Sequence, residues 1–528
     1  MPTLLQLVLA VASLLVAATD RALPQTADQV AGPPSQNVAA RPCQQNPGPI
    51  DNVPEIPGVV LRVSGDDVAL RISGDDVAGQ DLILPIAHDY LVGRGGSAVH
   101  TDDAPPPWRW QVSGDLLLGG SMSVLVRGSG STDGLRMLSV GDADIAVVGR
   151  ELDPPEEEAL SRYGNIVATG AAYPLARYAV VPAVKRDNPI EEISFDQLRD
   201  VFAGRLSDWS QLGGPVGPIQ LYGREEGTAI RRLFCQMIMG DVSFSPSLQT
   251  VLSYKDLYRA IANNRAAIGL LPQTPSFREN VKPLPLVLHG RRVQSDFYAI
   301  ATGDYPLLIP VTLLRRPGFP SLESIYFYFA AGSAGSQVNI AKQGYASMEP
   351  RLLLPTIDLL SAQEATGTSL RVSTTIRFPS DETELDLRSQ LLLDEVGPYL
   401  RGLRPGASHL LYVGFSDDSG DAQRDQEIAC KLAKIVAGEL KRRHEIPLGS
   451  ILSLGARFPL ASDFTAAGRR LNRRVEIRVR AGTDTRSIQG GARSEQLSEG
   501  ADRNAVGTPD KGAAVCEFNL EDHALGVK

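Results

Sequence analysis

The segment from residue 195 to residue 228 constrains the fold of this chain more than any other. A helix-like stretch (195–201) leads through a Trp-containing turn and a Gly-Gly pair into a strand-like run at 219–222. Arg224 follows that run, and Gly227-Thr228 opens a second helix-like stretch. A helix N-terminus offers free backbone N–H groups and a guanidinium offers forked donors. The segment therefore predicts an α/β unit that carries an anion pocket.

Strand-like and helix-like segments alternate through residues 59–349, which predicts α/β lobes with mainly parallel sheets. The expected strands are 123–127, 145–148, 179–182, 219–222 and 267–271, and the expected helices are 195–201, 229–239, 254–263 and 321–329.

A nine-residue block occurs twice in succession, at 61–69 and at 70–78, and each copy contains Ser-Gly-Asp-Asp-Val-Ala. Each copy is typical of a strand that runs into a Gly-Asp-Asp turn. Only the second copy continues into a helix-like segment (80–91), so only that copy fits a strand–loop–helix site.

The flanking segments differ in composition from the lobes. Residues 1–18 form an apolar run that ends in small residues, which predicts a secretory signal peptide; a retained membrane anchor is the alternative. Residues 19–58 predict a flexible linker, 350–368 a linker between domains, and 482–528 a disordered tail.

Composition excludes several functions. The net charge of −9, with both signs interleaved, argues against a nucleic-acid partner. The four cysteines form neither a CxxC pair nor a zinc spacing, and Cys235 and Cys430 are interpreted as buried inert thiols. The six histidines are isolated, so no metal site and no cofactor are expected. Without a nucleophile–base motif, we also expect no enzyme activity.

Residues 59–349 resemble the PstS-like phosphate-binding receptors of ABC transporters. The resemblance rests on the loop after the first strand, the Gly-rich loop at 128–131, the Ala-Asp-Ile stretch at 143–145 and the Arg224 segment. It implies a two-lobed periplasmic-binding-protein fold (type II) that closes by a hinge. The ligand-binding residues that it implies are Gly74, Asp75, Asp76, Val77, Ser129, Gly130, Ser131, Asp144, Arg224, Glu226, Gly227 and Thr228.

Two of these positions depart from the family pattern, because Asp76 and Glu226 stand where the family has hydroxyl side chains. A carboxylate about 4 Å from a phosphate repels it by about 4 kcal/mol at an effective dielectric constant of about 20. Three explanations stay open: the side chains turn away, they are protonated, or the ligand is not phosphate. A cleft that has lost tight phosphate binding is the alternative.

Residues 369–481 form a second α/β unit. Strands are expected at 371–378, 409–414, 451–455 and 475–479, and helices at 385–403 and 424–444. The unit resembles the OmpA-like peptidoglycan-binding domain through Gly414-Phe415-Ser416-Asp417 and the Asn-Arg-Arg-Val-Glu-Ile run at 472–477. The resemblance implies an α/β sandwich.

In that family an Asp and a helix Arg bind the charged ends of diaminopimelate. Asp417 keeps the first position, whereas the Arg position falls on Leu432, beside Lys431. Lysine cannot reproduce the forked contact of arginine. The implied peptidoglycan-binding residues are Asp417, Lys431, Arg473 and Arg474; a structural role for the two arginines and a domain without wall affinity stay open.

Together these features predict a periplasmic binding protein for phosphate or a related oxyanion, held on peptidoglycan near the outer membrane. An ABC permease is a further possible partner. An envelope structural or interaction protein without a small-molecule ligand is the alternative.

Overall fold

The computed structural model describes residues 68–104, 109–116, 120–274, 279–317, 321–353, 369–379, 385–480 and 514–516. The expected signal peptide, the first linker, most of the second linker and most of the first repeat copy lie outside the described residues.

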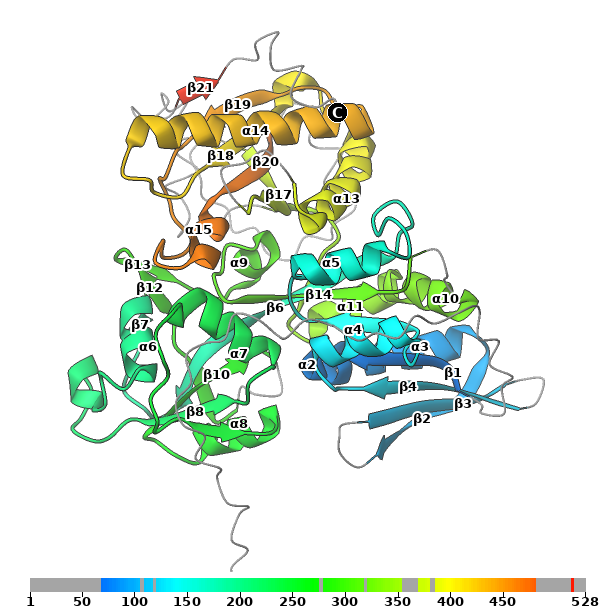
Figure 1. Cartoon of the computed structure of the whole chain (residues 1–528), viewed down its shortest axis with the longest axis horizontal. Coiled ribbons are helices and arrows are strands. Elements are labelled where there is room, and N and C mark those ends of the chain that lie inside the picture. Colours follow the sequence, from blue (N-terminus) through cyan, green and yellow to red (C-terminus); the bar gives the residue numbers. More distant parts are fainter. Residues whose placement is uncertain are drawn as a thin grey trace, which may run out of the picture. The chain divides into compact units, whose positions relative to one another are not determined.

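The receptor region, residues 68–347, is built on a twelve-stranded sheet with the order β2-β3-β4-β1-β5-β14-β6-β10-β8-β9, in which β11 and β15 also pair with β6 (Figure 1). The bounds are β1 (Val68–Gly74), β2 (Gly96–Ala104), β3 (Arg109–Leu116), β4 (Ser121–Arg127), β5 (Ile145–Val148), β6 (Ala172–Lys185), β8 (Gln220–Arg224), β9 (Gln249–Val251), β10 (Ala267–Pro272), β11 (Val281–Pro283), β14 (Leu308–Leu314) and β15 (Ala346–Ser347).

The prediction of mainly parallel sheets was wrong, because the sheet is mixed. Strand β1 runs parallel to β4 and β5, and β8 runs parallel to β9 and β10. The hairpin β2–β3 and the strands β14 and β6 pair antiparallel with their neighbours. The two parallel groups mark two lobes, and the long antiparallel strands β6 and β14 lie between them.

Strand β6 belongs to both lobes. Its first half pairs with β14 and its second half with β10 and β11. Twelve of its fourteen residues are buried, as an apolar strand covered on both faces requires. Strand β6 therefore connects the two lobes through one continuous sheet.

Helices cover both lobes, and side-chain caps fix where several of them begin. The first lobe carries α3 (Leu84–Gly93), α4 (Ser131–Val140), α5 (Pro154–Ser161), α10 (Leu322–Ala331) and α11 (Ala334–Lys342). The second carries α6 (Phe195–Phe202), α7 (Ala229–Phe234) and α8 (Tyr254–Ala262), and α9 (Phe297–Thr302) precedes β14. Ser194 and Ser253 cap α6 and α8.

The predicted strands and helices of this region are confirmed, most of them with ends that differ by a few residues. The strand expected at 179–182 is part of the longer β6, and the long second-lobe helix forms as α7 followed by a π-helical segment (Cys235–Met239). The second repeat copy forms β1 and the short helix α2 (Asp76–Ala78). A π-helical segment (Gly79–Ile83) and α3 follow, as predicted.

The C-terminal region contains a six-stranded sheet with the order β16-β17-β20-β18-β19-β21, and α13 (Leu387–Leu403) and α14 (Ala422–His444) lie on one face of it (Figure 1). The strands are β16 (Leu352–Leu353), β17 (Ser369–Arg377), β18 (Leu410–Phe415), β19 (Ser450–Ser453), β20 (Arg474–Arg480) and β21 (Ala514–Cys516). The predicted elements of this region are confirmed.

The opposite face of this sheet carries charges. Because side chains alternate along a strand, Val475 and Ile477 join the helix-covered core while Arg474, Glu476 and Arg478 point the other way. These three residues are only 2% exposed. Arg371 of β17 joins them and binds Asp304, in the receptor region, through two hydrogen bonds of 2.5 and 2.8 Å. Charged side chains therefore connect the two regions, which lie in one compact unit.

The cysteine interpretation was wrong. Cys430 of α14 forms a disulfide with Cys516 of β21, across 86 residues of sequence, and Cys235 is also disulfide-bonded. Strand β21 pairs antiparallel with β19, so three residues of the expected disordered tail are ordered. The Cys430–Cys516 bond was not predictable from the spacing, since this pairing depends on how β21 returns to the sheet.

The described residues contain neither a candidate membrane span nor a candidate metal cluster. None of their helices is both long and apolar enough to cross a bilayer. Within the same ranges, no group of three or more His, Cys, Asp or Glu side chains is arranged to hold a metal ion.

Candidate functional site

The first part of the candidate site is the loop that follows β1. Gly74 has a φ of +152°, and a Cβ on it would lie 1.9 Å from the carbonyl oxygen of Val147, so only glycine fits. The Asp75 backbone N–H donates to that same oxygen at 2.9 Å, and its carboxylate accepts from the N–H of Ala78 at 2.9 Å. Asp75 thus caps α2 and presents Asp76 and Val77 at the end of the strand.

The Gly-rich loop after β4 lies directly beside this loop. The Gly130 N–H donates to the Gly74 carbonyl at 2.8 Å, and the hydroxyls of Ser129 and Ser73 are 2.9 Å apart. Ser131 accepts from the Gly149 N–H at 2.9 Å. Since β1, β4 and β5 are parallel, the loops meet at their shared carboxyl end, where open α/β sheets bind ligands.

The second lobe contributes Arg224, the last residue of β8. Its Nη2 lies 3.1 Å from Oδ2 of Asp76, so an ion pair joins the two lobes. Its guanidinium carbon lies 4.1 Å from the centre of the Tyr254 ring, in cation–π geometry. Arg224 is 4% exposed. The structure therefore brings Asp75, Asp76 and Arg224 together.

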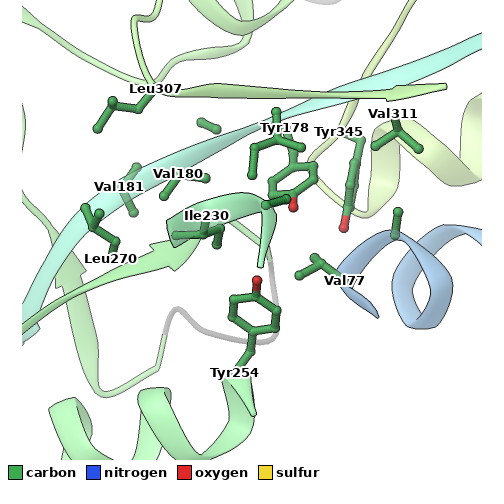
Figure 2. Packing of buried hydrophobic residues seen from close by; sticks show 14 of the residues in the cluster. Val77, Tyr178, Val180, Val181, Ile230, Tyr254, Leu270, Leu307, Val311 and Tyr345 are labelled. Atoms are coloured by element: carbon green, nitrogen blue, oxygen red, sulfur yellow. The ribbon is translucent and has the colours of Figure 1, made fainter. Parts of the chain in front are cut away.

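Several buried donors at this place lack a partner among the described residues. They are Nε and Nη1 of Arg224 and the hydroxyls of Tyr178 and Tyr254. In Figure 2 the hydroxyl ends of Tyr178 and Tyr254 point toward one another, beside Val77. Unpaired buried donors are rare and destabilise a fold, so a group of them suggests an acceptor that binds there.

Burial sets the protonation of the site. It raises the pKa of Asp75 to about 7, with the neighbouring charge of Asp76 as the second cause. Burial likewise raises the pKa values of Tyr178, Tyr254 and Tyr345 well above the usual range. The tyrosines are therefore hydrogen-bond donors at neutral pH, and Asp75 loses its proton only near pH 7.

Other expected residues lie elsewhere. Asp144 precedes β5, and its carboxylate accepts from the Arg71 N–H at 2.8 Å, at the end of the strands opposite to Gly74. Glu226 and Gly227 are exposed, whereas Arg224 is buried. The Thr228 hydroxyl donates to the Glu225 carbonyl at 3.0 Å. The structure does not bring Asp144 or Glu226 to the Arg224 site.

Sequence reasoning missed the tyrosines. Tyr178 lies in a buried apolar strand and Tyr254 at the start of an amphipathic helix, so both fit a core pattern. No signal in the sequence separates a core tyrosine from one that lines a cleft.

In the C-terminal region, two of the four expected residues meet. Arg473 Nη1 lies 2.8 Å from Asp417 Oδ2, and its Nη2 donates to the Pro379 carbonyl at 2.6 Å. Arg474 is instead buried, with its guanidinium carbon 3.6 Å from the centre of the Phe415 ring. Lys431 is exposed on α14, and Leu432 beside it is fully buried in the core.

Comparisons with known proteins match the part of the chain that contains Arg224. A profile of the PBP superfamily domain matches residues 120–322. The phosphate-binding protein PstS of Bacillus subtilis is 27% identical over 187 residues, which is 35% of this chain and 57% of the relative. The chain thus spans little more than half of that relative's length.

The chain is also similar to a solved structure and to a second curated protein. A solved ABC-type phosphate transport receptor from Vibrio cholerae is 21% identical, with a TM-score of 0.39, over 52% of this chain and 99% of that one. The YfiB protein of Escherichia coli is 30% identical over 111 residues, which is 21% of this chain and 68% of YfiB. The chain therefore carries a PBP superfamily domain and, over those 111 residues, belongs to the same family as YfiB.

Proposed function

We propose that the cleft between the two lobes binds phosphate or a related small oxyanion. The observation that carries this proposal is the buried Arg224, whose Nε and Nη1 lack a partner among the described residues. The named phosphate-binding relative of Bacillus subtilis supports the same ligand class. The tyrosine hydroxyls of Tyr178 and Tyr254 add neutral donors, which suit a small oxyanion.

The ion pair between Asp76 and Arg224 determines how tightly such an anion binds. Asp76 already neutralises Arg224 through Nη2, so an incoming anion meets a carboxylate as well as a guanidinium. Repulsion of about 4 kcal/mol at about 4 Å and a dielectric constant of about 20 offsets half of a micromolar affinity, about 8 kcal/mol. We therefore infer that the anion displaces Asp76 from Arg224 and binds weakly at neutral pH.

Asp75 makes this binding depend on pH. Its carboxyl is largely protonated below pH 7, and an anion placed nearby raises its pKa further. Anion binding is therefore accompanied by proton uptake, and we expect phosphate affinity to increase as the pH falls from 8 to 6.

The test is calorimetric titration of the full chain with phosphate, sulfate and arsenate. We expect Asp76→Ser to increase phosphate affinity by at least about tenfold, because one repelling charge is removed. Arg224→Met should abolish binding. Glu226→Gln is the matched control: it also removes one negative charge, but from an exposed position outside the cleft, and should change affinity little. Absence of binding by Asp76→Ser to all three anions would contradict the proposal.

The alternative is an envelope structural or interaction protein whose cleft holds no small molecule. The ion pair itself favours this alternative, because Asp76 then takes the place of a ligand and holds the lobes together permanently. The Asp76→Ser variant distinguishes anion binding from a scaffold role. If the protein is a scaffold, this variant should be less stable and should gain no affinity for anions.

We further propose that the C-terminal region binds peptidoglycan in the periplasm and so holds the receptor near the outer membrane. Asp417 supports this proposal, since its side chain is 14% exposed and keeps one partner, Arg473. A pull-down with purified sacculi checks it. We expect Asp417→Ala to reduce retention of the chain, and equal retention would favour an interaction domain without wall affinity. An ABC permease remains a proposed partner of the receptor region.

A further inference from the structure

A cavity of about 730 Å³ lies between the receptor region and the C-terminal region, away from the Arg224 cleft. Arg224, Asp76 and Tyr254 do not line it. Its described walls come from β6, α7 and β14 on one side and from β17, α13 and α15 (Ala466–Asn472) on the other. Seven arginines line it against three acidic residues, so its surface carries an excess of positive charge.

Most of these arginines are neutralised within the protein. Arg150 makes two hydrogen bonds of 2.6 Å to Glu156. Arg232 lies 2.5 Å from Asp153. Arg388 binds Glu151, and Arg470 binds both Glu151 and Asp386. These residues therefore need no further counterion.

Arg177 of β6 and Arg377 of β17 differ from these four arginines. Arg177 is 3% exposed, and its Nε lies 3.0 Å from the Met348 sulfur. Arg377 donates Nη2 to the Gly303 carbonyl at 2.5 Å, and its Nε is buried without a partner. Among the described residues, neither guanidinium forms an ion pair with a carboxylate.

The two guanidinium groups also lie close together. A Cβ built on Gly303 would be 2.6 Å from Nη1 of Arg177 and 3.0 Å from Nη2 of Arg377, so these nitrogens are at most 5.6 Å apart. The carboxylate of Asp304 acts electrostatically on both arginines, but it is already held by Arg371 through two hydrogen bonds. Two like charges at this separation, partly removed from water, destabilise the fold unless an anion joins them.

The electrostatics agree with this geometry. Burial, followed by the charge of Arg388, lowers the pKa of Arg377 to about 9 and the pKa of Arg177 well below its usual range. A guanidinium nevertheless stays protonated near neutral pH. The lowered pKa values therefore express how unfavourable these two charges are without a counterion.

We propose that this cavity binds a small organic dianion, bearing either a phosphate monoester or two carboxylates, between Arg177 and Arg377. Two forked guanidinium groups match the oxygens of such a group. Leu233, Ile309 and Phe464 offer apolar surface in the same cavity for the rest of the molecule. The volume lies within the range of about 300–1,000 Å³ that is typical of small-molecule sites.

This site and the cleft share one strand without sharing residues. Arg177 and Tyr178 are neighbours on β6, and successive side chains of a strand point to opposite faces. Arg177 therefore faces the cavity while Tyr178 faces the cleft. Variants of Arg177 and of Arg224 consequently test the two sites independently.

The experiment is calorimetric titration of the full chain with glucose 6-phosphate, which carries a phosphate monoester, and with succinate, which carries two carboxylates. We expect at least one of these probes to bind, and Arg177→Met or Arg377→Met to weaken its binding by at least about tenfold. The two probes distinguish a phosphate monoester from a dicarboxylate. The matched control is Arg232→Gln, which removes a paired arginine from the same cavity and should weaken binding less.

A second readout separates a ligand site from a structural role. Without ligand, the Arg177→Met variant should unfold at the same temperature as the wild-type chain or at a higher one, because the substitution removes an uncompensated buried charge. Binding of none of the probes, unchanged binding by Arg177→Met and Arg377→Met, or loss of binding through Arg224→Met would each overturn the proposal.

The chain itself offers a competing source of negative charge. Asp381, Glu382 and Glu384 follow Pro379 of the cavity wall in sequence and lie outside the described residues. If the cavity serves a ligand, D381N/E382Q/E384Q should bind the organic probe as tightly as the unchanged chain or more tightly. If this variant instead unfolds at a much lower temperature and binds no probe, the acidic side chains of this segment, and not a ligand, are the counterions of Arg177 and Arg377.

Discussion

Asp75 gives the receptor region a pH-dependent stability that one substitution removes. Its carboxyl is 2% exposed, and burial raises its pKa from 3.8 to about 7. A shift of about 3 units corresponds to about 4 kcal/mol. Because the folded state holds this proton more tightly than the unfolded state does, the contribution is fully present below about pH 4 and is lost as the pH rises to about 7.

The substitution to make is Asp75→Asn. The asparagine side-chain oxygen can still accept from the Ala78 N–H, so the cap of α2 is kept. We expect equal free energies of unfolding near pH 4 and a variant that is more stable by up to about 4 kcal/mol at pH 8.

Tryptophan fluorescence during denaturation with urea is a suitable assay, because all three tryptophans lie between residues 108 and 209, in the receptor region. Burial also raises the pKa of Asp81 to about 6. Because both proteins contain this carboxyl, it does not change the difference between their free energies of unfolding. If the stability curves of the two proteins stay parallel from pH 4 to pH 8, the reasoning about Asp75 is refuted.

Two further outcomes are expected. Arg371→Met should destabilise the chain by about 3–5 kcal/mol, because it leaves Asp304 buried without its counterion; calorimetric unfolding measures this, and a neutral effect would contradict the role of the pair. Replacing Cys430 and Cys516 together with serine should lower the free energy of unfolding by up to about 4–5 kcal/mol, as the 86-residue separation suggests, and an unchanged urea midpoint would contradict this prediction.

Local pattern made much of the fold predictable. The β1 loop could be located because Gly-Asp-Asp follows an apolar strand and only the second repeat copy continues into a helix. Arg224 could be located because a strand and a helix start flank it. These signals lie within a few residues of one another, so the sequence carries them without knowledge of the rest of the chain.

Other features depend on where distant strands come together. From the sequence, Asp76 is only a carboxylate in a turn. The tertiary fold pairs it with Arg224, 148 residues away. The exposure of Glu226 could not be predicted from its residue type either.

The sequence alone determined which segments become strands, turns and helix starts, because backbone sterics and hydrophobic periodicity act locally. Tertiary structure alone decided which charges neutralise one another. It paired Asp76 with Arg224, joined Cys430 to Cys516 and placed Arg177 beside Arg377 without a carboxylate between them. The physical reason is that Coulomb energy depends on separation in space and on burial, and a sequence pattern records neither.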